Sequence, residues 1–140
     1  MSVRLFATRH SHAELFAHVV WTTKDRVGLL GEAELAMIAP LMQGTAKKMG
    51  ALVYAAGGVE DHVHVLVRYR PDITVSNLVR AMKAAASYVL RRSATREFAW
   101  QEGYAAFSVS PNDVGRVEAY VLGQQEHHAR GNTWDEQEPG

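Results

Sequence analysis

The chain of 140 residues contains no cysteine, which excludes both a disulfide framework and a thiolate zinc site. Histidine, carboxylate and amide side chains remain as its metal ligands, and this set favours a hard cation over structural zinc. The sequence also lacks an apolar run of about 18 residues, the length that spans a bilayer. Residues 1–12 do not have the layout of a secretory signal. These absences predict a cytoplasmic protein that does not contact a membrane.

The sequence also carries no net charge, because 15 Lys and Arg residues balance 15 Asp and Glu residues. The balance conceals an asymmetry: residues 62–100 contain seven basic and two acidic residues, whereas residues 101–140 contain two basic and seven acidic ones. A local basic face is therefore compatible with overall neutrality, and we expect it to bind nucleic acid. The residues predicted to bind nucleic acid are Lys24, Arg26, Arg80, Lys83 and Arg91. The last three can equally form the solvated side of an amphipathic helix.

Hydrophobic residues make up 47% of the sequence, enough for one compact domain, which we expect over residues 1–130. Residues 131–140 are polar and acidic and are expected to form a flexible tail. Apolar and β-branched stretches predict strands over 15–23, 51–56, 62–69 and 104–110. The glycine-containing segment 57–61 is expected to join the second and third strands as a hairpin connection.

Apolar residues at helical spacing predict helices over residues 32–49, from Val75 to Leu90, and from Pro111 onward. Pro40 predicts a kink or a restart in the first of them. The order strand, helix, strand, strand, helix, strand, helix favours an α+β fold. We expect a ferredoxin-like antiparallel sheet with helices on one face, the other face being open for function. An extra C-terminal helix completes this arrangement.

A pair of histidines, His62 and His64, lies within the third predicted strand. Alternation along a strand places both imidazoles on one face and Val63, Val65 and Val67 on the other. Two neutral imidazoles held in register form half of a site for a divalent cation. Taken alone, such a pair is more often a solvated or hydrogen-bonded surface feature, so a metal site needs further ligands.

The last predicted helix offers such groups, because Tyr120 and Gln124 are four residues apart and so are neighbours on one helix face. A tyrosine hydroxyl is protonated at neutral pH and needs a nearby positive charge or base to act as a nucleophile. A divalent cation bound to His62, His64 and Gln124 would polarise a phosphodiester oxygen and orient the phosphate for in-line attack by Tyr120. Without these partners Tyr120 would be an ordinary amphipathic side chain on a helix flank.

Other histidines and aromatic residues are interpreted as structural. His127 and His128 lie near the end of the last helix, where interaction with the helix dipole and solvent is commoner than metal ligation, so neither is taken as a ligand. Trp21, Trp100 and Phe107 are expected in the core rather than in a platform on which bases stack.

Three groups of motifs resemble the small single-tyrosine transposases of bacterial insertion sequences, the IS200-like members of the HUH superfamily. The matching segments are residues 60–67, 100–104 with 107–110, and 120–128. The resemblance implies cleavage of single-stranded DNA at element ends folded into hairpins, with magnesium or manganese. It further implies a 5′-phosphotyrosine intermediate, a free 3′-hydroxyl, and rejoining of strands without an external energy source. Such enzymes are homodimers, in which the tyrosine helix of one subunit can complete the histidine site of the other.

By motif match the resemblance assigns Tyr120 as the nucleophile and His62, His64 and Gln124 as metal ligands. Gly123 departs from the family pattern, in which a larger polar residue is expected, and glycine costs a helix about 1 kcal/mol relative to alanine. We interpret Gly123 as a hinge. Two alternatives remain open: a catalytically inactive dimer of the same fold that binds hairpin DNA or RNA, and a dimeric small-ligand module.

Overall fold

The structure is a computed structural model that describes residues 12–93, 97–131, 133–134 and 138. Its elements follow the predicted order, with two short 3-10 turns added. They are β1 (Leu15–Thr22), η1 (Lys24–Arg26), α2 (Glu32–Lys48), β2 (Leu52–Val59), β3 (His62–Tyr69), α3 (Val75–Ser93), β4 (Ala105–Val109), η2 (Pro111–Asp113), α4 (Val114–Leu122) and α5 (Gln124–Arg130).

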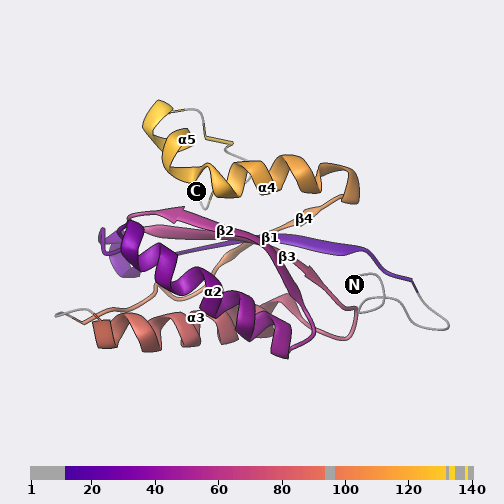
Figure 1. Cartoon of the computed structure of the whole chain (residues 1–140), viewed down its shortest axis with the longest axis horizontal. Helices are drawn as coiled ribbons and strands as arrows, with labels where there is room; N and C mark the ends of the chain where they lie inside the picture. The colour runs from indigo at the N-terminus through magenta and orange to yellow at the C-terminus, as the bar shows by residue number, and fades with distance from the viewer. Residues whose placement is uncertain (1–11, 94–96, 132, 135–137, 139–140) are drawn as a thin grey trace.

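The four strands form one antiparallel sheet in the order β2-β3-β1-β4. Helices α2 and α3 lie on one face of this sheet, and α4 and α5 lie on the other (Figure 1). The predicted α+β class, with its antiparallel sheet and extra C-terminal helix, is confirmed. The expectation that the second face is open is wrong, because α4 packs against it through Val117 and Val121. Among the described residues, no helix has both the length and the apolarity needed to cross a membrane.

The face under α2 and α3 carries the main core. Alternate residues of β1 and β3 point into it, and both helices supply apolar stripes at the predicted spacing. Its fully buried members include Val19, Trp21, Val63, Val65 and Val67 from the strands and Ile38, Met42, Leu78, Val79, Met82 and Leu90 from the helices. Burial of each such aliphatic side chain contributes about 1.5–3 kcal/mol relative to exposure.

The opposite face has a smaller apolar cluster and a buried polar group. Phe16 and Leu66 of the sheet pack against α4, while His18, His62 and His64 are at most 1% exposed beside them. The residues of β1 and β3 that do not face the main core therefore supply two kinds of side chain, apolar ones under α4 and imidazoles near α5.

Strand β2 is longer than predicted, because Gly57 and Gly58 lie inside it and the connection to β3 is shorter than the expected segment 57–61. Gly57 pairs with His64, and a Cβ atom placed on it would lie 2.1 Å from the carbonyl oxygen of Val121. The absence of a side chain at Gly57 thus lets the end of α4 approach the sheet next to His64.

Two helix predictions are corrected in detail. Helix α2 continues from Glu32 to Lys48 with Pro40 inside it, so it does not restart there. The last helix, predicted as one, is divided at Gly123 into α4 and α5. The amide of Gly123 still donates to the carbonyl of Ala119 (3.0 Å), so the break is local.

Candidate active site

His62 and His64 point from β3 toward α4 and α5, with ring centroids 5.1 Å apart. The predicted alternation is confirmed, because Val63, Val65 and Val67 all lie in the core on the opposite face. The two imidazoles are at most 1% exposed, so they do not form the solvated surface pair that is the commoner outcome for such a motif.

Neighbouring groups fix the orientation of both rings. Nδ1 of His62 donates to Oδ1 of Asp61 (2.7 Å), and Nδ1 of His64 lies 2.7 Å from Nε2 of His18. With Nδ1 protonated in each ring, both Nε2 lone pairs are available to a cation, which is the usual arrangement of metal-binding histidines. The Nε2 atom of His64 is buried and has no hydrogen-bond partner in the part of the chain that the structure describes. Such an orphan atom is costly, and a cation would satisfy it.

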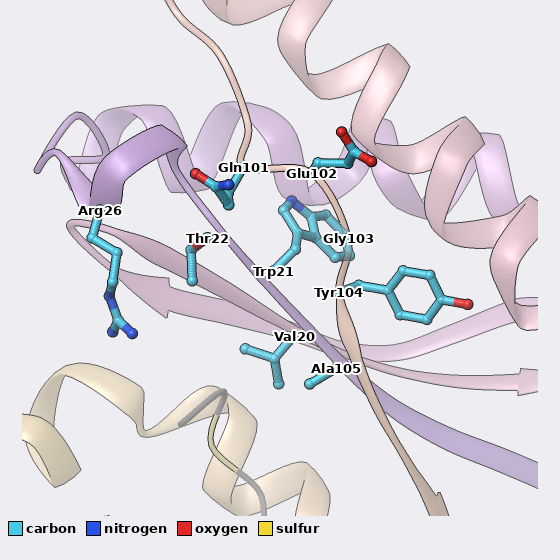
Figure 2. A pocket seen from close by; sticks show the side chains of 9 residues that line it. All are labelled: Val20, Trp21, Thr22, Arg26, Gln101, Glu102, Gly103, Tyr104 and Ala105. Atoms are coloured by element: carbon cyan, nitrogen blue, oxygen red, sulfur yellow. The ribbon is translucent and has the colours of Figure 1, made fainter.

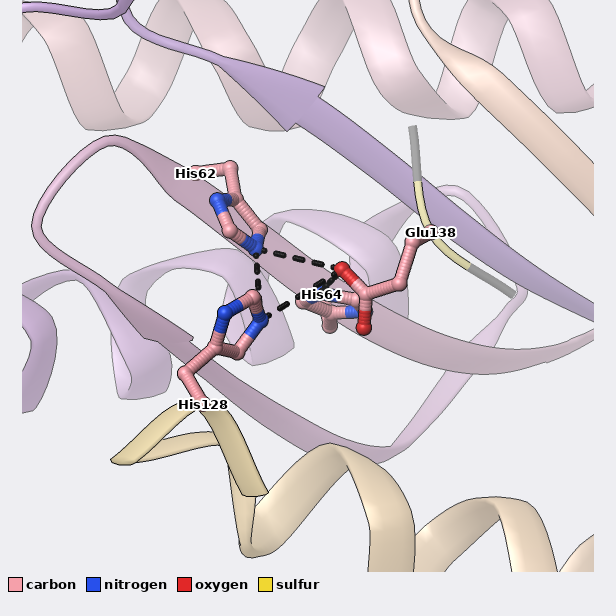
Figure 3. Close-up of side chains that lie close together, drawn as sticks. All are labelled: His62, His64, His128 and Glu138. Atoms are coloured by element: carbon pink, nitrogen blue, oxygen red, sulfur yellow. Dashed lines mark hydrogen bonds and ion pairs between the residues drawn. The ribbon is translucent and has the colours of Figure 1, made fainter. Parts of the chain in front are cut away.

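Two further residues complete a cluster around these nitrogen atoms (Figure 3). Nε2 of His128, from α5, lies 3.3 Å from Nε2 of His62. Oε1 of Glu138 lies 3.4 Å from Nε2 of both His62 and His64 and 3.5 Å from Nε2 of His128. The four ligand atoms all lie within 4.8 Å of one another, and the group could hold a metal ion. His128, which sequence reasoning set aside, therefore belongs to the site.

Tyr120 of α4 lies in the same site and in the same chain. Its ring centroid is 6.0 Å from that of His64, and its hydroxyl donates to Oε2 of Glu138. The backbone amide of Trp134 donates to the same hydroxyl at 2.9 Å. Tyr120 is 5% exposed, so Glu138 and Trp134 take part in covering it.

Gln124 begins α5 and is 1% exposed. Its Nε2 atom donates to the carbonyl oxygen of Tyr120 (3.0 Å), and its Oε1 atom lies 3.1 Å from Nε2 of His128. The four-residue spacing from Tyr120 therefore brings the Gln124 amide to the edge of the cluster, beside His128.

The surroundings set the protonation states of these groups. Burial lowers the pKa of His64 to about 4, so its imidazole is neutral at pH 7. Burial raises the pKa of Tyr120 to about 12, and the hydrogen bond to Glu138 adds to this. Burial disfavours the carboxylate of Glu138, but the neighbouring imidazoles of His62 and His64 and the hydrogen bond from Tyr120 outweigh it and hold the pKa of Glu138 below its usual value. The phenol is thus protonated beside an ionised carboxylate.

The predicted basic residues lie in two separate places. Arg80, Lys83 and Arg91 are on α3, on the far side of the sheet from the histidines. Lys83 donates to the carbonyl oxygens of Gln101 and Gly103 (2.9 Å each), and Arg91 donates to that of Phe98 (3.0 Å). Two of these three side chains therefore hold the segment that leads into β4.

Arg26 lies by contrast on the rim of a pocket of about 330 Å³ at the end of β1, to which Gln101 and Tyr104 also contribute (Figure 2). Two other lining residues, Val20 and Thr22, pair directly with His64 and His62. The pocket thus begins next to the histidine pair. Lys24 is exposed in the same 3-10 turn as Arg26.

Comparison with known proteins agrees with this geometry. A sequence model described as "Transposase IS200 like" matches residues 11–124. The chain belongs to the IS200-like transposase family. The ISDra2 transposase TnpA of Deinococcus radiodurans is 23% identical over 120 residues, covering 81% of this chain and 86% of the relative.

Two solved structures share the fold of this IS200-like transposase. One is a crystal structure from Deinococcus radiodurans R1 assigned as a transposase, with a TM-score of 0.68 and 20% identity over 82% of this chain and 94% of the other. The second is a REP-associated tyrosine transposase bound to a REP hairpin, with a TM-score of 0.63 and 12% identity over 91% and 75% of the two chains. At these identities the likeness shows the fold alone.

Three residues of the site were missed by sequence reasoning. His18 shares the period-two pattern of Phe16 and Val20 in β1, so alternation could have placed it beside His64. His128 follows Gln124 by four residues, the same spacing that links Tyr120 and Gln124. Glu138 carries no such signal. It belongs to the predicted tail 131–140, most of which lies outside the described residues, and the division between domain and tail stays a prediction.

Proposed function

We propose that this IS200-like transposase cleaves and rejoins single-stranded DNA at insertion-sequence ends, with Tyr120 as the nucleophile and a divalent cation as cofactor. One observation supports this most directly: the Tyr120 hydroxyl shares a buried site with the Nε2 atoms of His62 and His64, within one chain. A phenol needs a neighbouring positive charge to attack phosphorus at neutral pH. The histidine cluster is where such a charge would be held.

The residues present fit the implied cation. His62, His64 and His128 offer nitrogen atoms, and Gln124 offers an amide oxygen beside them. Of the two predicted ions, manganese accepts imidazole more readily than magnesium, which prefers oxygen ligands. When bound, the cation would polarise a phosphate oxygen and offset the charge that develops in the transition state.

In the proposed reaction one bond to phosphorus forms and another breaks. The Tyr120 oxygen forms a bond to phosphorus while the bond from phosphorus to the 3′-oxygen breaks. The phenolic proton is released as the new bond forms, and the departing 3′-oxygen gains a proton to become a free hydroxyl. One phosphodiester is replaced by another, so strands can be rejoined without an external energy source.

The approach of DNA is proposed from the pocket next to the histidines. Arg26 lines this pocket and Lys24 belongs to the same 3-10 turn, where both would contact phosphates of a single strand. The backbone at Asp25 and Arg26 has φ values of 56° and 55°, a left-handed conformation that costs about 1–3 kcal/mol per residue and is commoner at functional sites. Arg80, Lys83 and Arg91 would serve a separate surface, if they contact DNA.

The proposed partner is single-stranded DNA that folds into a hairpin, in line with the REP hairpin bound by the structural neighbour. We also propose a homodimer, which would bring two DNA ends together. Its second subunit is not needed to complete the site described, because one chain supplies the tyrosine and the histidines.

A covalent-adduct assay tests this function. Labelled single-stranded hairpin DNA with manganese should form an adduct with the wild-type protein that survives denaturation. Tyr120→Phe should form none while still binding the DNA. Tyr88→Phe is a matched control, because Tyr88 is 57% exposed on α3, and it should form the adduct normally. A wild-type protein that binds the hairpin and never becomes linked to it would favour the alternative of a catalytically inactive DNA- or RNA-binding dimer.

A further inference from the structure

The carboxylate of Glu138 occupies the place between the histidines and the tyrosine. Its Oε1 atom faces the Nε2 atoms of His62, His64 and His128 (Figure 3). Its Oε2 atom accepts the hydrogen bond from Tyr120. A scissile phosphate would need the same two contacts, one oxygen toward the cation and the phosphorus atom beside the phenol. Both groups are anionic, and they cannot occupy this place together.

Four of the six distances among the ligand atoms match those of a four-coordinate site, and all six are within 4.8 Å. Nitrogen and oxygen ligands about 2.0–2.1 Å from a tetrahedral ion lie about 3.3–3.4 Å from one another. Glu138 Oε1 lies 3.4 Å from Nε2 of His62 and of His64 and 3.5 Å from Nε2 of His128, and the His62 and His128 nitrogens are 3.3 Å apart.

We propose that Glu138 is a displaceable fourth ligand, which closes a cation site with His62, His64 and His128 in the DNA-free chain and holds the position of the scissile phosphate. The identity of the displacing group rests on the proposed function. The closed site itself rests only on the four side chains. DNA would reach Tyr120 by replacing Glu138, so the chain restrains its own activity until a substrate competes for the cation.

Trp134, four residues before Glu138, also contacts Tyr120. Its backbone amide donates to the Tyr120 hydroxyl, and its ring packs edge-on against the Tyr120 ring at 5.8 Å. The guanidinium of Arg116 lies 4.0 Å from the centroid of the Trp134 indole. The two contacts between Trp134 and Tyr120 involve the residue that DNA must reach.

A competing interpretation makes Glu138 the general base for Tyr120. One feature disfavours it in this arrangement. Oε1 fills the side of the site that a phosphate oxygen needs, so the carboxylate and the phosphate cannot both be bound there. The two interpretations predict opposite effects of Glu138→Gln on cleavage.

Cation affinity of the DNA-free protein is the first test, measured by calorimetry with manganese and with zinc. Glu138→Gln should weaken binding at least about tenfold, since loss of outer-shell partners alone costs 10–100-fold at such sites. Cobalt absorption adds a spectroscopic readout, because the four-coordinate band of the wild type should weaken in the variant. Glu126→Gln changes the same charge at an exposed ion pair with Arg130 and should leave both readouts unchanged. Equal affinities in wild type and Glu138→Gln would overturn the proposal.

Single-turnover cleavage of hairpin DNA is the second test. Glu138→Gln should form the covalent adduct about tenfold faster than wild type at saturating manganese, because no ligand has to be displaced. A slower reaction would identify Glu138 as a base and overturn its assignment as a displaceable ligand. If neither protein forms an adduct, the proposed function fails, whereas the calorimetric comparison still decides whether Glu138 is a ligand.

Discussion

The two faces of the sheet use the same strands for different purposes. On one face, β1 and β3 meet α2 and α3 through aliphatic side chains and a tryptophan. On the other, β3 presents His62 and His64, buried beneath elements that also bring Tyr120, His128 and Glu138. Among the described residues, each face has a buried nitrogen without a hydrogen bond, Trp21 Nε1 on the first and His64 Nε2 on the second, but at His64 several ionisable groups are buried together, which is costly. The comparison indicates that the core face supplies stability and that the histidine face keeps a costly, reactive arrangement in place.

The separation follows from the period of two along a strand. Val63 and His64 are adjacent in sequence, yet they lie in different environments, one among aliphatic side chains and the other beside polar groups. Changes on the two faces should therefore have separable effects on stability and on cation binding.

The largest effect is expected on the core face. Leu78 of α3 is fully buried, and Leu78→Ala should lower the free energy of unfolding by about 2–5 kcal/mol through lost burial and a residual cavity. The cation affinity of the folded fraction should not change. Denaturant unfolding and calorimetry on the same samples measure both quantities. A parallel fall in cation affinity would show that the two faces are coupled.

A smaller loss is expected from Gly57→Ala, which acts on the histidine face. The new Cβ atom would meet the carbonyl oxygen of Val121 at 2.1 Å, so the end of α4 must move, at a cost of about 1–3 kcal/mol. Adduct formation should fall more steeply than stability, because Tyr120 lies on α4. Gly44→Ala in α2 is the matched control, since nothing lies within 4 Å of its Cβ position, and it should be neutral or stabilising. Equal adduct yields in the two variants would contradict this account.

Substitutions of His18 test whether the orientation of the His64 ring matters for cation binding. His18→Leu removes the acceptor for Nδ1 of His64 and should weaken cation affinity 10–100-fold, which corresponds to about 1.4–2.7 kcal/mol. His18→Gln places an acceptor near the same position and should restore most of the affinity. Calorimetry with manganese measures both variants. If leucine and glutamine behave alike, His18 does not orient His64 for the cation.

The features of the molecule that were predicted correctly are local. Alternation placed His62 and His64 opposite Val63, and helical spacing located α3, because each pattern depends on only a few neighbouring residues. The second face of the sheet was wrongly expected to be open, because its coverage depends on where α4 packs after β4. The packing of α4 needs close contact at Gly57, a residue that the sequence predicts to lie in the connection between two strands.

The additional ligands depend on longer-range placement. His128 reaches His62 only because α5 begins anew after Gly123 and brings its first turns over the histidines. Glu138 lies seventy-four residues from His64 in sequence, and no periodic pattern connects them. Sequence spacing could link Tyr120 with Gln124, but it could not indicate which carboxylate would meet the tyrosine.

The smallest effect is expected from single substitutions of basic residues, either in the η1 turn or on α3. Lys24→Ala, near the pocket beside the histidines, should weaken hairpin DNA binding and reduce by about 1 the slope of the logarithm of affinity against the logarithm of salt concentration. Arg80→Ala, on α3 across the sheet, should leave that slope unchanged and alter stability by less than about 0.5 kcal/mol, because Arg80 is exposed and its hydrogen bond to Asn77 is local. Filter-binding titrations over a range of salt concentrations measure both. A slope that falls only in Arg80→Ala would place the DNA on the α3 surface and move the proposed path away from the pocket.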